Sequence, residues 1–272
     1  MSSNVMTAPG KYALATGAQA VGRLHVLHEV YGPAGLRFLL HAGLREGMRV
    51  ADFGCGVGVV TRTLADVVGP DGFVTGIDVN AEQVEEAAAL CAAHGFDNVD
   101  FVEASAVDTG LFSESFDLVY CRFLLLHLTD PEACLREMRR VLKPRGLLVI
   151  EDGDLTSAGS VPPTAFNAFS SLWNVLGPIR KVDYSISNRL YHLVREAGFS
   201  DVNVEIHQPA EACGPTGMLL KWSVREAGHA FIEAGLISPI ELQIALDEME
   251  VAHQDPNVLA LGPRMTQVSA RK

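Results

Sequence analysis

Apolar and polar residues follow two different periods along the middle of the chain. Short apolar runs, which are typical of buried strands, alternate with longer segments whose apolar positions recur at helical spacing. Alternation of strands with helices predicts a parallel sheet that is covered on both faces. The runs that we interpret as strands are RVADF at 49–53, FVTGID at 73–78, NVDFVEA at 98–104, FDLVYCR at 116–122 and LLVIED at 147–152.

Capping residues indicate where several helices begin and end. Asn80 is a typical N-cap for the helix after the second strand, and Gly95 is a typical stop at its other end. Asp130, which a proline follows, indicates the start of a further helix. Two more strands are predicted near the C-terminus, DVNVEIH at 201–207 and RMTQVSA at 264–270.

Three segments depart from this alternation. Residues 1–45 have apolar helical patterns, residues 153–187 form an insertion after the fifth strand, and residues 208–262 separate the last two strands. The third segment contains a helix near 216–234 and another that opens with the capping box SPIE at 238–241. Helices added to a strand-based core favour a lid over its ligand-binding face.

The chain is therefore expected to have four parts. A Rossmann-like cofactor-binding core spans residues 46–207, including the insertion, and residues 263–272 add its last strand. We expect residues 1–45 to form an N-terminal helical lid. The helical insertion at 208–262 is expected to cover the substrate.

Composition narrows the classes of function. The formal net charge is −12, and such an acidic chain repels the phosphates of nucleic acids. No apolar run is long enough to span a bilayer and the N-terminus lacks a secretory signal, so we expect a cytoplasmic protein without a membrane partner. The cysteines form no CxxC pair, which argues against disulfides and a thiolate zinc site.

A glycine-rich loop follows the first strand. Ligands bind beyond the carboxyl ends of parallel strands, where Gly54, Gly56 and Gly58 let the backbone approach closely. Asp78 ends the second strand, where a carboxylate typically binds both hydroxyls of a ribose. The GxGxG spacing and the adjacent Asp52 disfavour a pyrophosphate and suit a nucleoside with a cationic amine, such as S-adenosylmethionine. An NAD-dependent dehydrogenase is the alternative.

The strands and their following loops resemble a known family. VADFGCGVGVVT, GIDVN, FVEASAVD, FDLVYCRFLLLHLTDP and VLKPRGLLVIED are similar, in order and spacing, to the successive motifs of class I S-adenosylmethionine-dependent methyltransferases. The resemblance is strong over 49–152 and weaker over 188–207 and 264–271. It implies a seven-stranded, mostly parallel sheet with helices on both faces and an antiparallel last strand. The terminal helical segments resemble those of bacterial small-molecule methyltransferases of secondary metabolism.

The matching motifs show which positions of this sequence correspond to the family's binding residues. The resemblance implies that Asp52 and the loop hold the methionine part of the cofactor, that Asp78 binds the ribose and that Val79 lies against the adenine. Ser105 stands where the family often has an acid, so its hydrogen bond to the adenine is expected to be weaker. The full set of predicted cofactor-binding residues is Tyr12, Asp52, Gly54, Cys55, Gly56, Gly58, Asp78, Val79, Gln83, Ser105, Ala106, Cys121 and Arg122.

Catalytic candidates are fewer, because methyl transfer needs a general base only when the acceptor must lose a proton. His127 follows the fourth strand and could act as a base, although a structural role is the favoured interpretation. His28 lies on the N-terminal helix and could face the substrate. Tyr12 could close over the cofactor or be a loosely packed aromatic residue. The acids of EDGD at 151–154 could bind magnesium, but the matching acid after the fourth strand is absent, so we expect no metal.

Three hypotheses follow for the function. The first is methyl transfer from S-adenosylmethionine to an oxygen, nitrogen or carbon atom of a small molecule, with S-adenosylhomocysteine as product. The second is a methyltransferase-like enzyme that keeps its cofactor and catalyses a cyclisation or rearrangement. The third, a non-catalytic binding subunit, is disfavoured by the intact glycine loop. Apolar helical segments that could pair two subunits make a homodimer possible.

Overall fold

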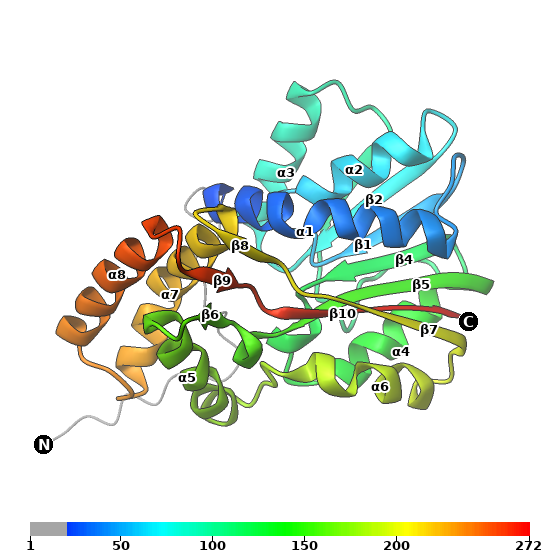
Figure 1. Cartoon of the computed structure of the whole chain (residues 1–272). Coiled ribbons are helices and arrows are strands. Elements are labelled where there is room, and N and C mark those ends of the chain that lie inside the picture. The colour runs from blue at the N-terminus through cyan, green and yellow to red at the C-terminus, as the bar shows by residue number, and fades with distance from the viewer. Residues whose placement is uncertain (1–20) are drawn as a thin grey trace, which may run out of the picture.

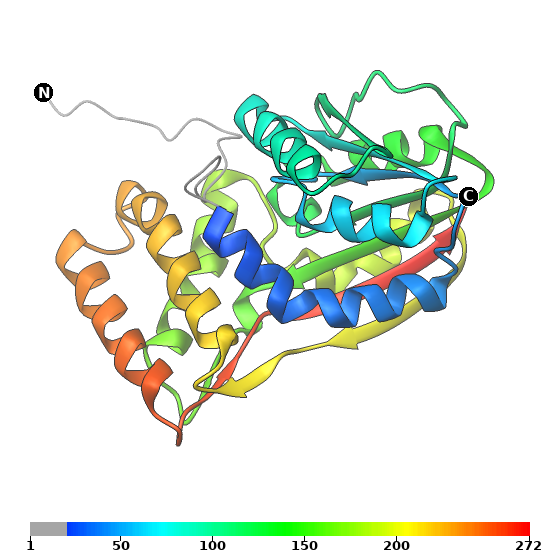
Figure 2. The same cartoon turned by 90° about the horizontal axis from the view of Figure 1, so that it is seen from above.

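The computed structural model describes residues 21–272, so the predicted contact of Tyr12 lies outside the described residues. An α/β part and a helical part lie side by side, and the N-terminal helix α1 (Val21–Ala42) runs along both (Figures 1 and 2). Helix α1 continues through Pro33. A Cβ atom at Gly35 would lie 2.7 Å from Oε2 of Glu151, so this glycine permits close contact with the sheet.

The α/β part is built on one seven-stranded sheet. Its order is β3-β2-β1-β4-β5-β10-β7, in which the first five strands are parallel and β10 runs antiparallel to both of its neighbours. The predicted fold class, including the antiparallel last strand, is thereby confirmed. The strands are β1 (Arg49–Phe53), β2 (Phe73–Asp78), β3 (Val99–Glu103), β4 (Phe116–Arg122), β5 (Leu142–Asp154), β7 (Ser200–His207) and β10 (Arg264–Arg271).

Successive side chains of the central strands pack into two different apolar clusters, as the two-residue period of a strand requires. Val50 belongs to a cluster with residues of α1 and α2 (Val59–Val68). Its neighbour Ala51 belongs to another, with residues of α4 (Pro131–Val141) and α6 (Leu190–Glu196). Both faces of the sheet are therefore covered. Helix α3 (Ala81–Ala93) contacts β2 and β3.

The helical part lies beyond the carboxyl end of β5 (Figure 1). It consists of α5 (Ala165–Arg180), α7 (Pro215–Glu233) and α8 (Pro239–Gln254). The capping box at the start of α8 is confirmed: Ser238 Oγ accepts from the Glu241 amide at 3.2 Å, and Glu241 Oε2 accepts from the Ser238 amide at 2.7 Å. Within residues 21–272, no helix has the length and apolar character needed to cross a membrane.

Two features differ from the sequence prediction. Strand β5 extends two residues beyond its predicted end, to Asp154, so all three acids of EDGD lie inside the strand. A second sheet, with the order β6-β9-β8, joins two of the three segments that depart from the main pattern, 153–187 and 208–262. Its strands, β6 (Gly159–Val161), β8 (Ala210–Ala212) and β9 (Leu259–Leu261), pair antiparallel. Three-residue strands are too short to show a sequence period.

Candidate functional site

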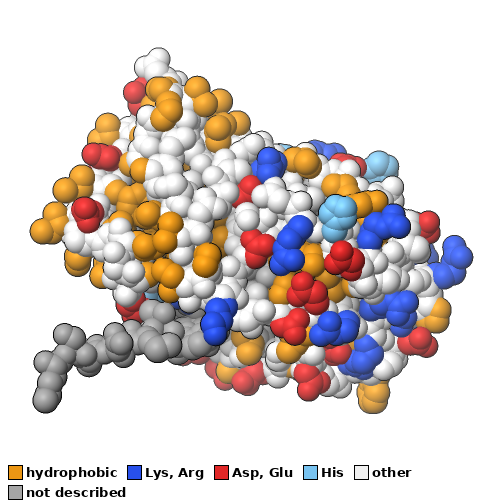
Figure 3. Space-filling model, turned by 90° about the horizontal axis from the view of Figure 1, so that it is seen from below, with side chains coloured by type: hydrophobic (Ala, Val, Ile, Leu, Met, Phe, Trp, Pro, Cys, Tyr) orange, Lys and Arg blue, Asp and Glu red, His pale blue; other side chains and the backbone are white. Residues whose placement is uncertain are grey.

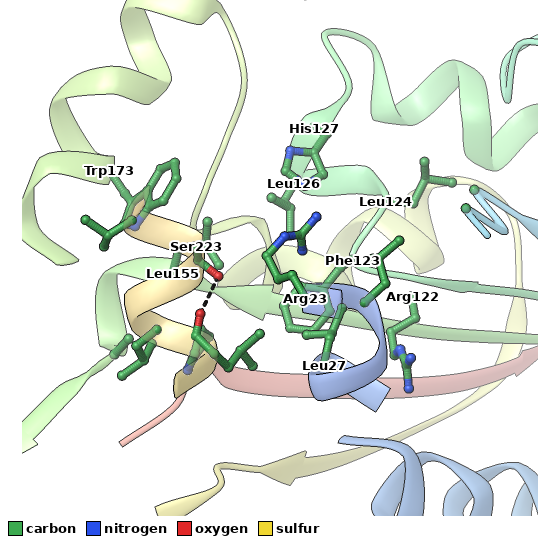
Figure 4. A pocket seen from close by; sticks show the side chains of 18 of the residues that line it. Arg23, Leu27, Arg122, Phe123, Leu124, Leu126, His127, Leu155, Trp173 and Ser223 are labelled. Carbon is green, nitrogen blue, oxygen red and sulfur yellow. Dashed lines mark hydrogen bonds between the residues drawn. The ribbon is translucent and has the colours of Figure 1, made fainter. Parts of the chain in front are cut away.

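A cavity of about 930 Å³ opens where β1, β2 and β4 end. The strand order reverses between β1 and β4, and such a switch point is where open α/β sheets bind ligands. The cavity extends from the glycine loop into the helical part, so one space joins two different environments. Figure 4 shows the side chains of α1, the loop after β4 and the helical part converging on it.

The glycine loop forms one wall of this cavity. Gly54, Gly56 and Gly58 have φ angles of 70°, 54° and 75°, a region that glycine adopts without strain. A Cβ atom at position 54 would lie 2.9 Å from Cδ1 of Leu124, and one at position 56 would lie 3.0 Å from Oε1 of Gln83. The first two glycines thus keep open a space next to the backbone. Gly58 caps α2, packs near Ala87 and does not line the cavity.

Asp78 lies at the rim of the cavity with its carboxylate held by the backbone. Oδ2 accepts from the Gly56 amide at 3.0 Å, and Oδ1 accepts from the Asn80 amide at 3.0 Å. Burial raises the pKa of Asp78, and these hydrogen bonds act in the opposite direction. Each carboxylate oxygen can accept a further hydrogen bond, so the group is suited to a pair of adjacent hydroxyls.

Asp52 is enclosed below the loop. It is 2% exposed, accepts a hydrogen bond from Thr61 Oγ1 at 2.7 Å, and does not line the cavity. Burial raises its pKa to about 7. Any effect of Asp52 on a cationic ligand would therefore be exerted through the loop, because the side chain itself does not reach the cavity.

The predicted cofactor residues divide into two groups. Those that line the cavity are Gly54, Gly56, Asp78, Val79, Gln83 and Arg122. Those that lie outside its lining are Asp52, Cys55, Gly58, Ser105, Ala106 and Cys121. Cys55 and Cys121 are buried, and burial raises the pKa of both thiols. Ser105 lies in an exposed turn, where its Oγ accepts from the Val107 amide at 3.4 Å.

His127 does reach the cavity. It ends the 3₁₀ turn η2 (Leu125–His127) and meets the ring of Tyr184 edge-on, with ring centroids 6.1 Å apart. Burial lowers the pKa of His127 to about 3, with Arg23 and Arg180 adding to the effect. The imidazole is therefore neutral at pH 7. It can form hydrogen bonds, but a group with so low a pKa is a weak base.

His28 lies beside the cavity without lining it. Its Nδ1 is 3.5 Å from Nη2 of Arg122, and its Nε2 is 3.5 Å from Oγ1 of Thr63. Burial lowers the pKa of His28 to about 4, and the charges of Arg122 and Arg62 act in the same direction. A neutral His28 contacts Arg122, which does line the cavity, so its influence on a ligand would be indirect.

Each of the three acids of EDGD forms hydrogen bonds or an ion pair with other residues of the protein. Glu151 accepts from Tyr120 and Gln267, and Asp152 Oδ2 accepts from the Leu125 amide at 2.7 Å. Asp154 forms an ion pair with Arg264, with 3.1 Å between Oδ2 and Nη2. Throughout the part of the chain that the structure describes, no three His, Cys, Asp or Glu residues are grouped as metal ligands.

The end of the cavity away from the glycine loop is apolar. Trp173 and Phe166, two aromatic residues of α5, line it. Arg23 was missed, although a single arginine within the apolar run VGRLHVL was a visible signal. The apolar chamber, as we call this end, is lined by Leu126, Leu128, Leu155, Ala158, Phe166, Trp173, Leu219, Leu220, Val224 and Met249.

Comparison with known proteins agrees with this geometry. The family model described as a methyltransferase domain matches residues 44–198, more than half of the chain. The chain is 40% identical over 112 residues to the ubiquinone/menaquinone biosynthesis C-methyltransferase UbiE of Hahella chejuensis (strain KCTC 2396), a match that covers 40% of this chain. That match spans 45% of the relative's length, so the chain spans less than half of the curated relatives it matches.

Solved structures share the fold. An S-adenosylmethionine-dependent methyltransferase from Aquifex aeolicus is 26% identical with a TM-score of 0.53, over 67% of this chain and 86% of that one. The [4+2]-cyclase SpnF has a TM-score of 0.54 at 20% identity, over 97% of this chain and 86% of that one. The second likeness concerns the fold alone. From the family match, the five motifs and the sheet order together, the chain belongs to the methyltransferase domain family, as a class I S-adenosylmethionine-dependent methyltransferase.

Proposed function

We propose that this protein transfers the methyl group of S-adenosylmethionine to a carbon atom of a small, largely apolar acceptor. The observation that carries the proposal is the single cavity that joins the glycine loop and Asp78 to the apolar chamber. The cofactor supplies a sulfonium methyl group that is open to direct displacement. Its reactive end must meet the acceptor where the polar and apolar ends of this cavity adjoin.

The residues present suit the two ends of such a cofactor. Gly54 and Gly56 leave room beside the backbone for the methionine part, and the Asp78 carboxylate is held in position to accept the ribose hydroxyls. Val79 and Gln83 line the adjoining wall, which fits the adenosine part. The roles of the predicted residues that do not line the cavity, Ser105 and Ala106 among them, remain proposals.

The acceptor would be positioned by the helical part. Helices α1, α5, α7 and α8 each contribute side chains to the cavity, which supports the proposed role of these segments as a lid and substrate-binding part. Aligning the acceptor with the methyl group and excluding water supply most of what a methyl displacement requires. His127 would contact the acceptor as a neutral hydrogen-bonding group, because its low pKa makes it a poor base.

The choice of carbon as acceptor atom rests on relatives. UbiE is named as a C-methyltransferase of ubiquinone and menaquinone biosynthesis, and the relative from Staphylococcus aureus (strain JH9) is named as a demethylmenaquinone methyltransferase. We extend this to an aromatic or quinone-like ring for the present chain, because Trp173 and Phe166 stand in the apolar chamber. A role in secondary metabolism, a cytoplasmic location and a homodimer stay predictions.

The proposal is tested by incubating the protein with S-adenosylmethionine and a panel of hydroquinones and naphthols. Mass spectrometry should detect a product heavier by one methylene unit together with an equal amount of S-adenosylhomocysteine. A folded protein that binds neither S-adenosylmethionine nor S-adenosylhomocysteine would contradict the proposal.

A cofactor-retaining cyclisation or rearrangement is the second candidate. The similarity in fold to a [4+2]-cyclase shows that this architecture is also found in a protein named for a cyclisation. The same incubation separates the two functions. Conversion of a substrate without any S-adenosylhomocysteine would favour the cyclase, whereas stoichiometric S-adenosylhomocysteine would exclude it.

A further inference from the structure

Arg23 is a buried charge at the acceptor end of the cavity. Its side chain is 4% exposed, lines the cavity and comes from the first turns of α1. Nε donates to Oε2 of Glu226 on α7 at 2.6 Å. Nη2 is also buried, and it has no hydrogen-bond partner among the described residues. Burying an unsatisfied donor of a charged group is costly, so a site of this kind calls for a partner.

The surroundings of Arg23 indicate that the missing hydrogen-bond partner of Nη2 is a ligand and not a group of the protein. In Figure 4 its guanidinium group points toward Leu126 and His127, while Arg122 extends in another direction. Neither neighbour is an anion, and because burial lowers the pKa of His127 to about 3, its neutral ring adds no positive charge that would compete with Arg23 for an anionic ligand. Among the described residues, the ion pair with Glu226 is made through Nε, and Nη2 has no hydrogen-bond partner.

Charge divides the cavity into two ends. Its other charged lining residues among those described, Asp78, Glu82 and Arg122, belong to the strand ends and to α3, next to the glycine loop. Arg23 instead contacts α7, which also supplies Leu219, Leu220 and Val224 to the apolar chamber. One guanidinium group is thus set at the edge of an apolar space large enough for a ring system.

These contacts define what the site can bind. A guanidinium group only donates hydrogen bonds, so its partner must be an acceptor atom, and its charge favours an anionic oxygen. The body of the ligand must be apolar to fit against Trp173, Leu155 and Met249. A cationic or amine-bearing acceptor would be repelled at the same position.

We propose that Arg23 binds an anionic oxygen, such as a phenolate, enolate or carboxylate, on an otherwise apolar acceptor and so selects the substrate. This inference rests on the proposed function and names the substrate class of that same site. Arg23 is a specificity-determining residue in this account. Glu226 positions it, because the ion pair fixes the guanidinium group and leaves Nη2 for the ligand.

The test uses two probes of the same shape, 2-naphthoate and 2-naphthamide, titrated into the full chain that is saturated with S-adenosylhomocysteine. Calorimetry should show at least about tenfold tighter binding of the carboxylate, the size of effect expected for one charge-assisted hydrogen bond. The double variant Arg23→Gln/Glu226→Gln removes the charge without leaving Glu226 unpaired. It should bind both probes equally.

Matched controls keep the outcomes separate. Arg225→Gln changes an exposed arginine on α7, the helix that carries Glu226, and should keep the tenfold preference for the carboxylate. The double variant should bind S-adenosylhomocysteine as the wild type does and give the same circular dichroism spectrum. No preference for the carboxylate in the wild type, absence of binding included, would overturn the inference, as would a preference that survives the double variant. If the wild type does not bind S-adenosylhomocysteine, that result would contradict the proposed function instead.

Discussion

Gly54 lines the cavity in a backbone conformation that favours glycine. Gly54→Ala forces a left-handed conformation on alanine and brings its Cβ atom to 2.9 Å from Leu124. Affinity for S-adenosylhomocysteine should fall at least about tenfold, because the loop must shift into the cavity. The measurement is calorimetric titration of the folded variant.

Gly110 offers the matched control for this change. Its φ angle of 68° is close to the 70° of Gly54, but nothing lies within 4 Å of the position of its Cβ atom. Gly110→Ala should therefore cost about 1 kcal/mol in stability and leave binding unchanged. If both variants bind equally well, the close approach at Gly54 has no functional meaning.

His127 yields a prediction about pH. The pKa of a histidine in the unfolded chain is about 6.5, whereas burial lowers that of folded His127 to about 3. Between these values the unfolded chain binds more protons than the folded protein, so this group makes stability fall as pH drops below 6.5. His127→Gln should reduce the loss of stability between pH 7.5 and pH 5 by about 1 to 2 kcal/mol.

Denaturant titrations at the two pH values measure this difference. His192→Gln, which changes a histidine on the surface of α6, serves as the control and should leave the pH dependence as it is in the wild type. An unchanged pH dependence in the His127 variant would show that folding does not lower the pKa of the His127 ring. The base role would then regain support.

Sequence alone located the residues whose chemistry is local. Gly54, Gly56 and Asp78, which line the cavity, could be predicted because a tight loop and a strand end have recognisable sequence patterns. Arg23 was missed because its importance depends on α1 crossing the cavity and meeting Glu226, which lies 203 residues away in the sequence. The exclusion of Asp52 from the cavity was likewise invisible, since it depends on the orientation of the side chain toward Thr61.

At the scale of elements, the start of α8 gives a test of helix capping apart from function. Ser238→Ala removes the side-chain oxygen that accepts from the Glu241 amide, and should cost about 1 kcal/mol in stability. Affinity for S-adenosylhomocysteine should not change, because α8 reaches the cavity only through Met249 in the apolar chamber.

The control for the cap keeps its hydrogen-bonding groups. Glu241→Gln retains an oxygen that can accept from the Ser238 amide, so its effect on stability in thermal unfolding should be clearly smaller. A Ser238 variant that is as stable as the wild type would indicate that packing alone fixes the start of α8.

How accurately a strand was predicted from the sequence depended on its length and on the burial of its residues. The bounds of β1, β2 and β4 agree with the apolar runs, because a buried parallel strand leaves a continuous apolar signal. Strand β5 was predicted too short at both ends, since buried acids at its end look like a polar turn in sequence. The small sheet β6-β9-β8 arises from pairing between distant segments, which no local pattern records.

At the scale of the whole molecule, the two parts differ in surface character. Figure 3 shows apolar side chains gathered over the helical part and charged side chains over the α/β part. Exposed apolar residues of α5 and α8 include Val175, Ile179, Ile240, Ile244 and Val251. The fold class was predictable from the order of strands and helices. The way in which the segments outside this order enclose one cavity was not.

The central claim is that the glycine loop and Asp78 bind S-adenosylmethionine. The most direct measurement is calorimetric titration of the wild type and of Asp78→Asn with S-adenosylmethionine, S-adenosylhomocysteine and NAD, with Glu85→Gln on the exposed face of α3 as the control. The account predicts binding of the first two ligands alone, weakened at least about tenfold by Asp78→Asn and unchanged by Glu85→Gln. Binding of NAD, or equal affinity in the wild type and Asp78→Asn, would contradict it.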